Sequence, residues 1–326
     1  MKAALTFLKK QILYQTLKIF LIAAILITIS YKAHAQRKAL WTFVAESRIE
    51  KTQGARTIIP RAYKTIELNQ TALTRLLKTL PMENIVPVRN SKFNIGLPMP
   101  DGTIQYFKVV ESPVMEPELA KKYPQIKTYS GQSLSDPTAT VRFDWTPKGF
   151  HAMILSSAGT VFIDPYSNAD IAHYLSYFKK DFIPMNGTKK FEEGDGGENQ
   201  LKIKNTPDSP NNNKAQKALA PSGTQLHTYR LALAADHNYS AFQGGTKALT
   251  LSAMAITMNR VNGVYEREVS VHMNLISNTD ALIYITAASD PYTANGACDL
   301  RPQNQSNIDL VIGNSNYDIG HLFAMS

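Results

Sequence analysis

Cysteine is almost absent from this sequence, because the 326 residues contain only Cys298. One thiol cannot form an internal disulfide, which excludes a disulfide-stabilised scaffold. Two interpretations remain for Cys298: a buried, inert thiol, or a partner for a cysteine outside this sequence. A nucleophilic role is disfavoured, since the flanking GACDL places neither a histidine nor a helix amino terminus beside it.

Long apolar segments are also lacking. The run Ile19–Ile29 is well short of the roughly 20 residues that a membrane-spanning helix needs. It follows several lysines and precedes a small-x-small site formed by Ala33 and Ala35. We therefore predict that residues 1–35 are a signal peptide, with cleavage at Ala33 and Ala35, and that the remainder is secreted and free of the membrane. The alternative is an uncleaved signal anchor.

Excess positive charge is smaller than the net value of +9 indicates. Residues 1–35 carry five lysines and no acidic residue, so the remainder has 30 basic and 26 acidic residues, a net charge of +4. No basic stripe with interleaved aromatic residues is visible. Nucleic acid is therefore not expected as a partner.

Large apolar residues are nearly missing from residues 186–223, which are rich in Asn, Gly, Lys and Pro. Such a composition is typical of a flexible linker. It divides the chain into a first domain at 36–185 and a second segment at 224–326. The fold class predicted for the two together is a two-domain α+β or α/β arrangement.

The segment 36–185 carries strand and turn signals. Alternating apolar residues at 93–97 and 104–108 flank a turn at Pro100-Asp101-Gly102, and three further runs within 140–163 are separated by glycine-containing turns. A short helix is expected at 73–80. This domain should therefore be mainly antiparallel β. Its carboxylates Asp164 and Asp170 are interpreted as hydrated surface charges.

The segment 224–326 alternates between strand and helix patterns. Period-two runs occupy 228–234, 271–275 and 317–323, and helical patterns follow Gly244-Gly245 and surround 308–312. Crossovers of this length predict a parallel sheet with right-handed βαβαβ connections. The first strand should bury one face more deeply than the other.

The first predicted helix of that segment should be capped by Thr246. Its apolar residues recur at offsets of three and four and form one stripe, which consists of Leu251, Met254, Met258, Val261 and Tyr265. Gly263 lies within the helix and should cost about 1 kcal/mol relative to alanine. The last helical turns are therefore expected to be weak.

The amino-acid sequence of this segment resembles the reprolysin-like branch of the metzincin zinc endopeptidases. The similarity is densest in YRLALAADHNY, NRVNGVYERE and NSNYDIGHLF. The resemblance implies a secreted, zinc-dependent metalloendopeptidase that acts on protein or peptide substrates. It also implies that residues 36–185 are a prodomain that contacts the catalytic domain, because VVESPVMEPELAKKYPQIKTYSGQS and GFHAMILSSAGTVFIDPYS look like the prodomains of bacterial relatives.

The zinc sequence of that family, HExxHxxGxxH, is missing. The seven histidines are His34, His151, His173, His227, His237, His272 and His321, and none is paired in this way. By the resemblance the zinc helix would follow Phe323, so we expect an incomplete chain that is inactive alone, with zinc in the full-length protein and none bound here. Catalytic and metal-binding residues are accordingly assigned to none of these 326 residues.

Several histidines and acids still invite a site interpretation. His227 and His237 flank the first strand, but their spacing fits no zinc pattern, and solvated or hydrogen-bonded side chains are expected. His321 is expected to be partly buried and structural. Where some relatives bind calcium, the comparable residue here is Arg230, which could not ligate the ion.

Two functional classes remain open. In the first, the chain is part of a protease whose prodomain lacks cysteine, so that a cysteine on the zinc cannot provide latency and steric occlusion of the cleft remains. In the second, the chain is a secreted, non-catalytic binding or inhibitory module derived from such a protease.

Overall fold

The computed structural model describes residues 14, 15, 18, 39–49, 54–56, 58–168, 170–183, 225–293 and 296–325. Residues Met1–Leu40 and Trp41–Ser326 form two separate compact units. Of the first unit, residues 14, 15 and 18 are helical. The predicted cleavage residues Ala33 and Ala35, like the predicted linker at 186–223, lie outside the described residues.

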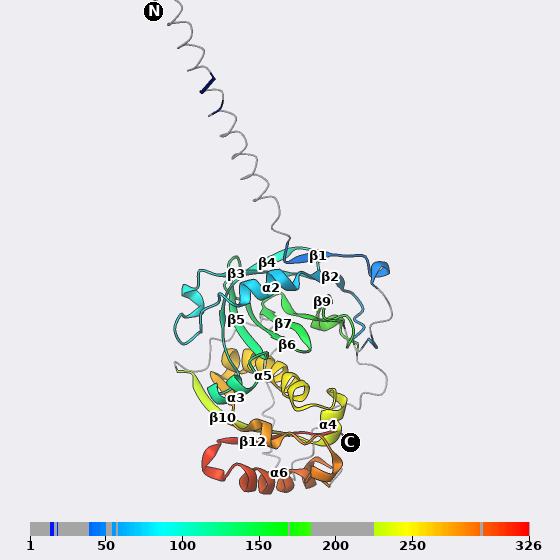
Figure 1. Cartoon of the computed structure of the whole chain (residues 1–326), viewed down its shortest axis with the longest axis vertical. Coiled ribbons are helices and arrows are strands. Elements are labelled where there is room, and N and C mark those ends of the chain that lie inside the picture. Colours follow the sequence, from blue (N-terminus) through cyan, green and yellow to red (C-terminus); the bar gives the residue numbers. More distant parts are fainter. Residues whose placement is uncertain are drawn as a thin grey trace, which may run out of the picture. The chain divides into compact units, whose positions relative to one another are not determined.

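A nine-stranded antiparallel sheet forms the amino-terminal part of the second unit (Figure 1). Its spatial order is β1-β2-β9-β8-β7-β6-β5-β4-β3. The strands are β1 Trp41–Phe43, β2 Lys64–Leu68, β3 Asn94–Pro98, β4 Ile104–Glu111, β5 Lys127–Ser133, β6 Thr140–Thr146, β7 Gly149–Ser156, β8 Gly159–Pro165 and β9 His173–Phe178. The predicted antiparallel β architecture of this part is confirmed, including the meander of β6, β7 and β8.

Tight turns join the strands of that meander. Gly149 and Gly159 have φ angles of 96° and 120°, a region that side chains with a Cβ atom rarely adopt. Helix α2, Gln70–Leu77, follows β2 and begins at the cap Asn69, whose side chain accepts a hydrogen bond from Ala72 N. The helix ends three residues before the predicted limit, because Lys78 and Thr79 already form a turn.

The two faces of the nine-stranded sheet differ in chemistry. One face carries a chain of packed aromatic rings, in which Tyr129 and Phe143 stack at 4.7 Å and Phe143 lies 5.6 Å from Phe150. Side chains alternate along a strand, so the neighbours Arg142 and Asp144 point to the opposite face. That second face therefore carries charged groups, although it is buried.

A three-stranded parallel sheet forms the carboxyl-terminal part, in the order β11-β10-β12. Its elements are β10 His227–Ala235, α4 His237–Phe242, α5 Lys247–Val269, β11 Val271–Leu275, α6 Ala297–Val311 and β12 Ile319–Phe323. Both neighbours pair with β10 in parallel, and Leu231 lies opposite Leu275 on one side and Ile319 on the other. The predicted βαβαβ order is confirmed, with α6 longer than the pattern at 308–312 predicted. The part of the chain that the structure describes is thus a mixed α+β fold.

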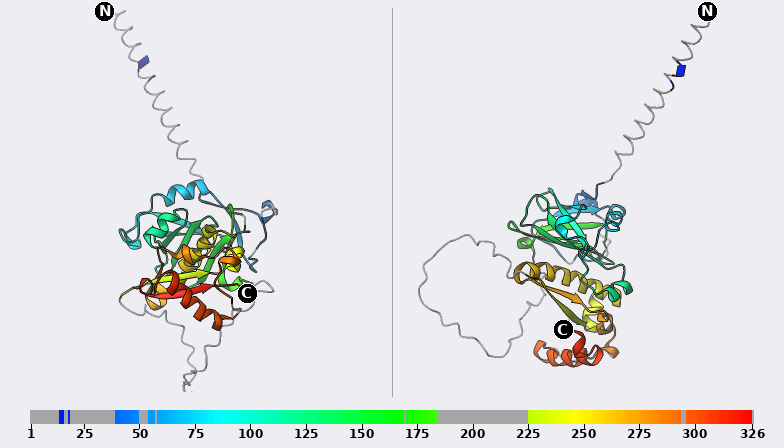
Figure 2. Two further views of the ribbon diagram at one scale, coloured as in Figure 1. Left: turned by 60° about the horizontal axis from the view of Figure 1, so that its bottom comes forward. Right: turned by 90° about the vertical axis from the view of Figure 1, so that its left-hand side faces the viewer.

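From Leu231 to Ala235 both faces of β10 are buried, whereas the alternation predicted one dominant buried face. Leu231 and Leu233 pack into a cluster with residues of α5, while Ala232 and Ala234 pack against Ile308 of α6. Figure 2 shows the resulting layers: the nine-stranded sheet, α5, the parallel sheet and α6. The prediction of one dominant buried face was wrong because Ala232 and Ala234 are only weakly hydrophobic. Their small side chains nevertheless allow α6 to pack closely against β10.

Helix α5 begins as predicted, with Thr246 Oγ1 accepting a hydrogen bond from Leu249 N. Leu251, Met254 and Met258 are buried in the predicted stripe. The prediction wrongly included Tyr265 in this buried stripe, because Tyr265 is 45% exposed. On this helix the apolar cluster reaches no further than Val261, and the last turns extend past it.

The last turns of α5 are not interrupted at Gly263, since the helix continues to Val269. A Cβ atom at position 263 would lie 2.8 Å from Arg142 Cγ and 3.1 Å from Met153 Cε. The glycine therefore allows α5 to approach strands β6 and β7 closely.

Among the helices of the described residues, none has the length and apolar character to cross a membrane.

Candidate functional site

Four histidines are each held by a carboxylate through Nδ1. These pairs are His151–Asp144 at 3.0 Å, His173–Asp170 at 2.8 Å, His237–Asp290 at 2.5 Å and His272–Glu266 at 2.5 Å. The histidines lie on different elements and do not converge. Within the described ranges, no three His, Cys, Asp or Glu side chains form a group that could hold a metal ion. The residues present therefore do not fit a zinc site.

Two further histidines of the described residues, His227 and His321, lie on the parallel sheet, and their exposure can be compared with the prediction. His227 is exposed at the start of β10, as expected. The residue His321 is exposed by surface area, yet burial of its imidazole lowers the pKa of His321, so the predicted partly buried position is met only in part. Its exposed part is explained by the position of β12, which is an edge strand and pairs only with β10 among the described strands. His321 packs edge-on against Phe323, with ring centroids 5.6 Å apart.

Asp236 connects the ends of three elements. Its Oδ1 accepts a hydrogen bond of 2.6 Å from Tyr239 N and caps α4, while Oδ2 accepts one of 3.1 Å from Met325 N beyond β12. Burial raises the pKa of Asp236, against the effect of these two N–H donors. The carboxylate thus holds the end of β10, the start of α4 and the segment after β12 in one arrangement.

Arg230, the residue at the predicted calcium-related position, crosses from β10 to the segment before β12. Its guanidinium forms an ion pair with Asp318 at 2.8 Å and donates to the Ser315 carbonyl at 3.1 Å. The bond to Asp318 raises the pKa of Arg230 further above its ordinary value. The side chain therefore supplies a permanent positive charge at this place in the sheet.

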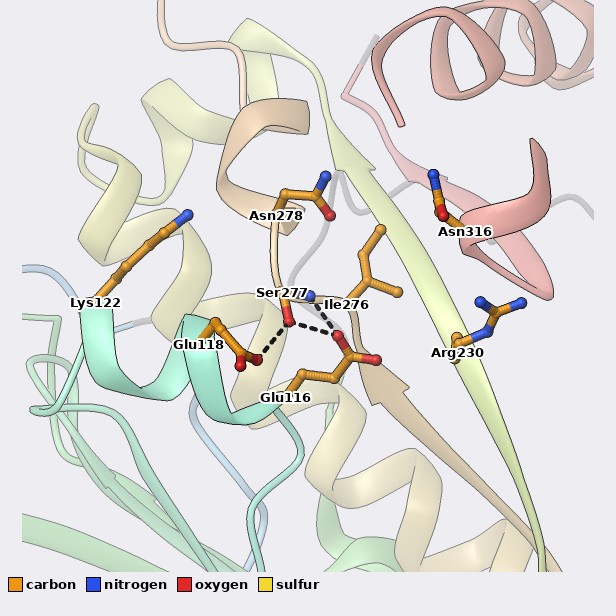
Figure 3. Close-up of a pocket in the computed structure, with 8 residues that line it drawn as sticks. All are labelled: Glu116, Glu118, Lys122, Arg230, Ile276, Ser277, Asn278 and Asn316. Carbon is orange, nitrogen blue, oxygen red and sulfur yellow. Dashed lines mark hydrogen bonds between the residues drawn. The ribbon is translucent and has the colours of Figure 1, made fainter. Parts of the chain in front are cut away.

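A pocket of about 470 Å³ lies beside Arg230, at the carboxyl end of β11 (Figure 3). It is lined by Glu116, Glu118, Lys122, Arg230, Ile276, Ser277, Asn278 and Asn316. In Figure 3 the hydroxyl of Ser277 lies within hydrogen-bond distance of both carboxylates, 2.7 Å from Glu116 and 3.0 Å from Glu118, so its one proton serves either acceptor. Ser277 N also donates to Glu116 at 2.8 Å.

The chemistry of this pocket is that of a polar junction. Ser277 Oγ donates to carboxylates, and no histidine or lysine nitrogen among the lining residues accepts its proton, so a nucleophilic serine is not assembled there. Glu116 and Glu118 come from the segment around helix α3, Pro117–Lys122, whereas Ser277 follows β11. The pocket therefore marks where the two parts of the unit meet.

A second junction joins α5 to the charged face of the nine-stranded sheet. Glu266 forms an ion pair with Arg142 and a hydrogen bond with His272. Desolvation opposes its ionisation, but the hydrogen bond from His272 and the charge of Arg142 hold the pKa of Glu266 below its usual range. Asn259 Nδ2 donates to the carbonyl of Phe143 at 2.9 Å. This junction is polar and its charged groups are paired, while Asn259 Oδ1 and Arg260 Nε are buried without a hydrogen-bond partner among the described residues.

Asp164 belongs to the same junction, and the prediction made for its side chain was wrong. It was interpreted as a hydrated charge, yet it is buried and accepts hydrogen bonds from Tyr177 at 2.7 Å and from Arg260 at 2.5 Å. Desolvation works against its charge, but the Arg260 guanidinium holds the pKa of Asp164 below its ordinary value. Asp170 is also buried, where it binds His173 and two backbone N–H groups.

The sequence contained a signal for this junction that the apolar stripe concealed. Polar or small residues recur on α5 at offsets of three and four, at Asn259, Arg260, Gly263, Glu266 and Arg267. With the apolar stripe opposite, this pattern is typical of a helix packed on two sides. No pattern in the residues around Ser277 indicated the junction there. The side chain of Cys298 lies outside the described part of the chain, so both interpretations of this thiol stay open.

Comparison with known proteins finds a similarity for the carboxyl-terminal part. Residues 225–326 match the model of metallopeptidase family M12B, described as reprolysin-like. The match begins just before β10 and includes the whole parallel sheet with α4, α5 and α6. The resemblance inferred from the residue patterns is therefore confirmed for this segment. No curated protein matches the sequence.

Proposed function

We propose that this chain is part of an exported zinc endopeptidase. The premise is that residues 225–326 belong to the reprolysin-like metallopeptidases of family M12B. The reaction would be hydrolysis of peptide bonds in proteins or peptides. The observation that carries the proposal is the coincidence of the family match with a three-stranded parallel sheet and two crossover helices in the predicted order.

Zinc is the cofactor of this family in general, and it supplies a Lewis acid and an activated water. These 326 residues contain no HExxH sequence, and the described histidines do not fit a zinc site. The ligands would therefore have to come from sequence outside these residues. We assign no catalytic step to this chain alone and expect it to be inactive.

Residues 36–185 would serve as the prodomain of the enzyme, and residues 1–35 as the signal peptide for secretion. The support for a prodomain is the packing of the nine-stranded sheet on α5, together with the position of this segment before the family match. The segment 186–223 would be the site of processing, where Lys189 and Lys190 offer a target for a protease.

Two measurements test this proposal. Zinc content of the purified chain, determined by elemental mass spectrometry after dialysis, is expected to be far below one equivalent, with no hydrolysis of casein. The coding sequence downstream of codon 326 is expected to encode HExxHxxGxxH. One tightly held zinc, or a downstream region without that motif in any frame, contradicts the proposal.

The second candidate is a secreted, non-catalytic binding or inhibitory module of the same ancestry. The observation that favours it is that residues Trp41–Ser326 form one compact unit, in which Met115 pairs with the outer edge of β11. A downstream region without the zinc motif would support this module, and a cleaved casein band would exclude it.

A further inference from the structure

We propose that the nine-stranded domain is a retained clamp on the metallopeptidase segment, which stays bound after the chain is cut between residues 184 and 224. The clamp holds α5 and the outer edge of β11. This inference concerns assembly and does not depend on peptidase activity, so its failure and that of the proposed function are distinguishable.

The first contact is a short extension of the parallel sheet by the preceding domain. Met115 pairs with Leu275 in a parallel bridge at the outer edge of β11. Leu275 N donates to the Val114 carbonyl at 2.8 Å, and Glu116 N donates to the Leu275 carbonyl at 2.9 Å. Residues 114–116 thus satisfy backbone groups that an open sheet edge would leave unpaired.

The second contact is a shared hydrophobic core. Four buried residues of the amino-terminal part, Val114, Met115, Leu119 and Ile126, belong to the same cluster as the buried apolar residues of β10, α5 and β11. All four are at most 6% exposed. Their removal would expose one side of that cluster to water, so the metallopeptidase segment needs them for a complete core.

The third contact consists of paired charges and hydrogen bonds spread over the whole interface. Arg142–Glu266 and Arg260–Asp164 link the nine-stranded sheet to α5, and Lys122–Asp280 links α3 to the loop after β11. Glu116 accepts from both the backbone N–H and the hydroxyl of Ser277. These contacts join residues on either side of segment 184–224, so they do not require an intact chain between the two parts.

The clamp occupies one side edge of the parallel sheet and leaves the other alone. Residues 114–116 lie at the β11 edge, whereas β12 is the opposite edge strand and pairs with no described strand except β10. A clamp in this place does not compete with anything that adds to β12. Release of the nine-stranded domain is therefore not needed to free that edge.

The test uses the full chain with the recognition sequence of a highly specific protease inserted between residues 184 and 224. After the cut, size-exclusion chromatography and native mass spectrometry at micromolar concentration are expected to find both fragments in one particle. Hydrogen exchange should show unchanged protection of Leu275 N–H and Ser277 N–H. Separate elution of the fragments, aggregation after cutting, or loss of that protection overturns the inference.

A matched pair of variants tests the role of the interface. Glu116→Ala removes both bonds to Ser277 and should weaken association of the cut fragments by about tenfold or more. Glu67→Ala removes an exposed carboxylate of β2, which has no contact across this interface among the described residues, and should leave association nearly unchanged. Circular dichroism of the uncut variants checks that both fold. Equal behaviour of the two variants contradicts the assignment of Glu116 to the clamp.

Discussion

The ion pair between Arg142 of β6 and Glu266 of α5 allows the strength of the clamp to be measured. The Arg142 side chain is 7% exposed and that of Glu266 is 23% exposed. Glu266→Gln preserves the side-chain shape but leaves the guanidinium charge buried beside a neutral amide. Removing one partner of a buried pair costs about 3–5 kcal/mol.

Two features of the site reduce that cost. Glu266 keeps some contact with water, and Arg142 retains its hydrogen bond of 2.8 Å to Ser112 Oγ. We therefore expect Glu266→Gln to lower the free energy of unfolding by about 2–3 kcal/mol. Arg142→Met removes the charge from the other side. The double variant should be less destabilised than the sum of the single variants, by about 1–3 kcal/mol.

The assay is urea unfolding followed by tryptophan fluorescence, with linear extrapolation to water. The pair Lys127–Glu111 serves as the control, because its lysine side chain is 39% exposed and its coupling should be about 0.5 kcal/mol. Additivity of the Arg142 and Glu266 variants to within about 0.5 kcal/mol would refute the view that this pair holds α5 on the sheet.

Three further predictions follow from the same contacts. Fluorescence of Trp41 and Trp145, which lie in the nine-stranded part, and far-ultraviolet circular dichroism of the helices should report one coincident unfolding transition, whereas two transitions would show that the shared core does not couple the parts. Acidification should destabilise the fold, because the folded-state pKa values of Glu266 and Asp164 lie below their unfolded values; their contribution is present above an unfolded pKa of about 4 and is lost as the pH falls through the lower folded values. An unfolding free energy that rises steadily from pH 5 to pH 2, a window chosen around that unfolded pKa of about 4, would contradict this sign. Asp236→Ala should cost about 1–2 kcal/mol by leaving two N–H groups without their acceptor, and Asp236→Asn should cost less because its carbonyl oxygen still caps α4; equal stability of the two variants would exclude the capping role.

Prediction from sequence succeeded where the signal was local. The strands β10 and β11 and the capped start of α5 follow from side-chain periodicity and from Thr246, which all act within a few residues. The antiparallel meander likewise follows from short apolar runs and glycine turns at Gly149 and Gly159. In these segments, local preference and tertiary packing favour the same structure.

Prediction failed where a residue's environment is made by distant parts of the chain. Asp164 was interpreted as hydrated because nothing near it in sequence could pair with it, and its partner Arg260 is 96 residues away. Tyr265 fitted the apolar stripe of α5, but the cluster that the stripe packs against ends before it. The position of His321 was predicted only in part, because its exposure depends on which edge of β12 is paired.

The sequence by itself determined the order of elements in residues 225–326 and their similarity to a peptidase family, because hydrophobic spacing, caps and sequence motifs are properties of neighbouring residues. Only the tertiary structure decided that α5 lies between two sheets and that Met115 closes the edge of β11. Arg142 and Glu266 are separated by 124 positions. A pattern that repeats every two to four residues cannot indicate which distant segment supplies the ion-pair partner of Arg142. The clamp exists because burial of both faces of α5 and pairing of the β11 edge stabilise the folded chain as a whole.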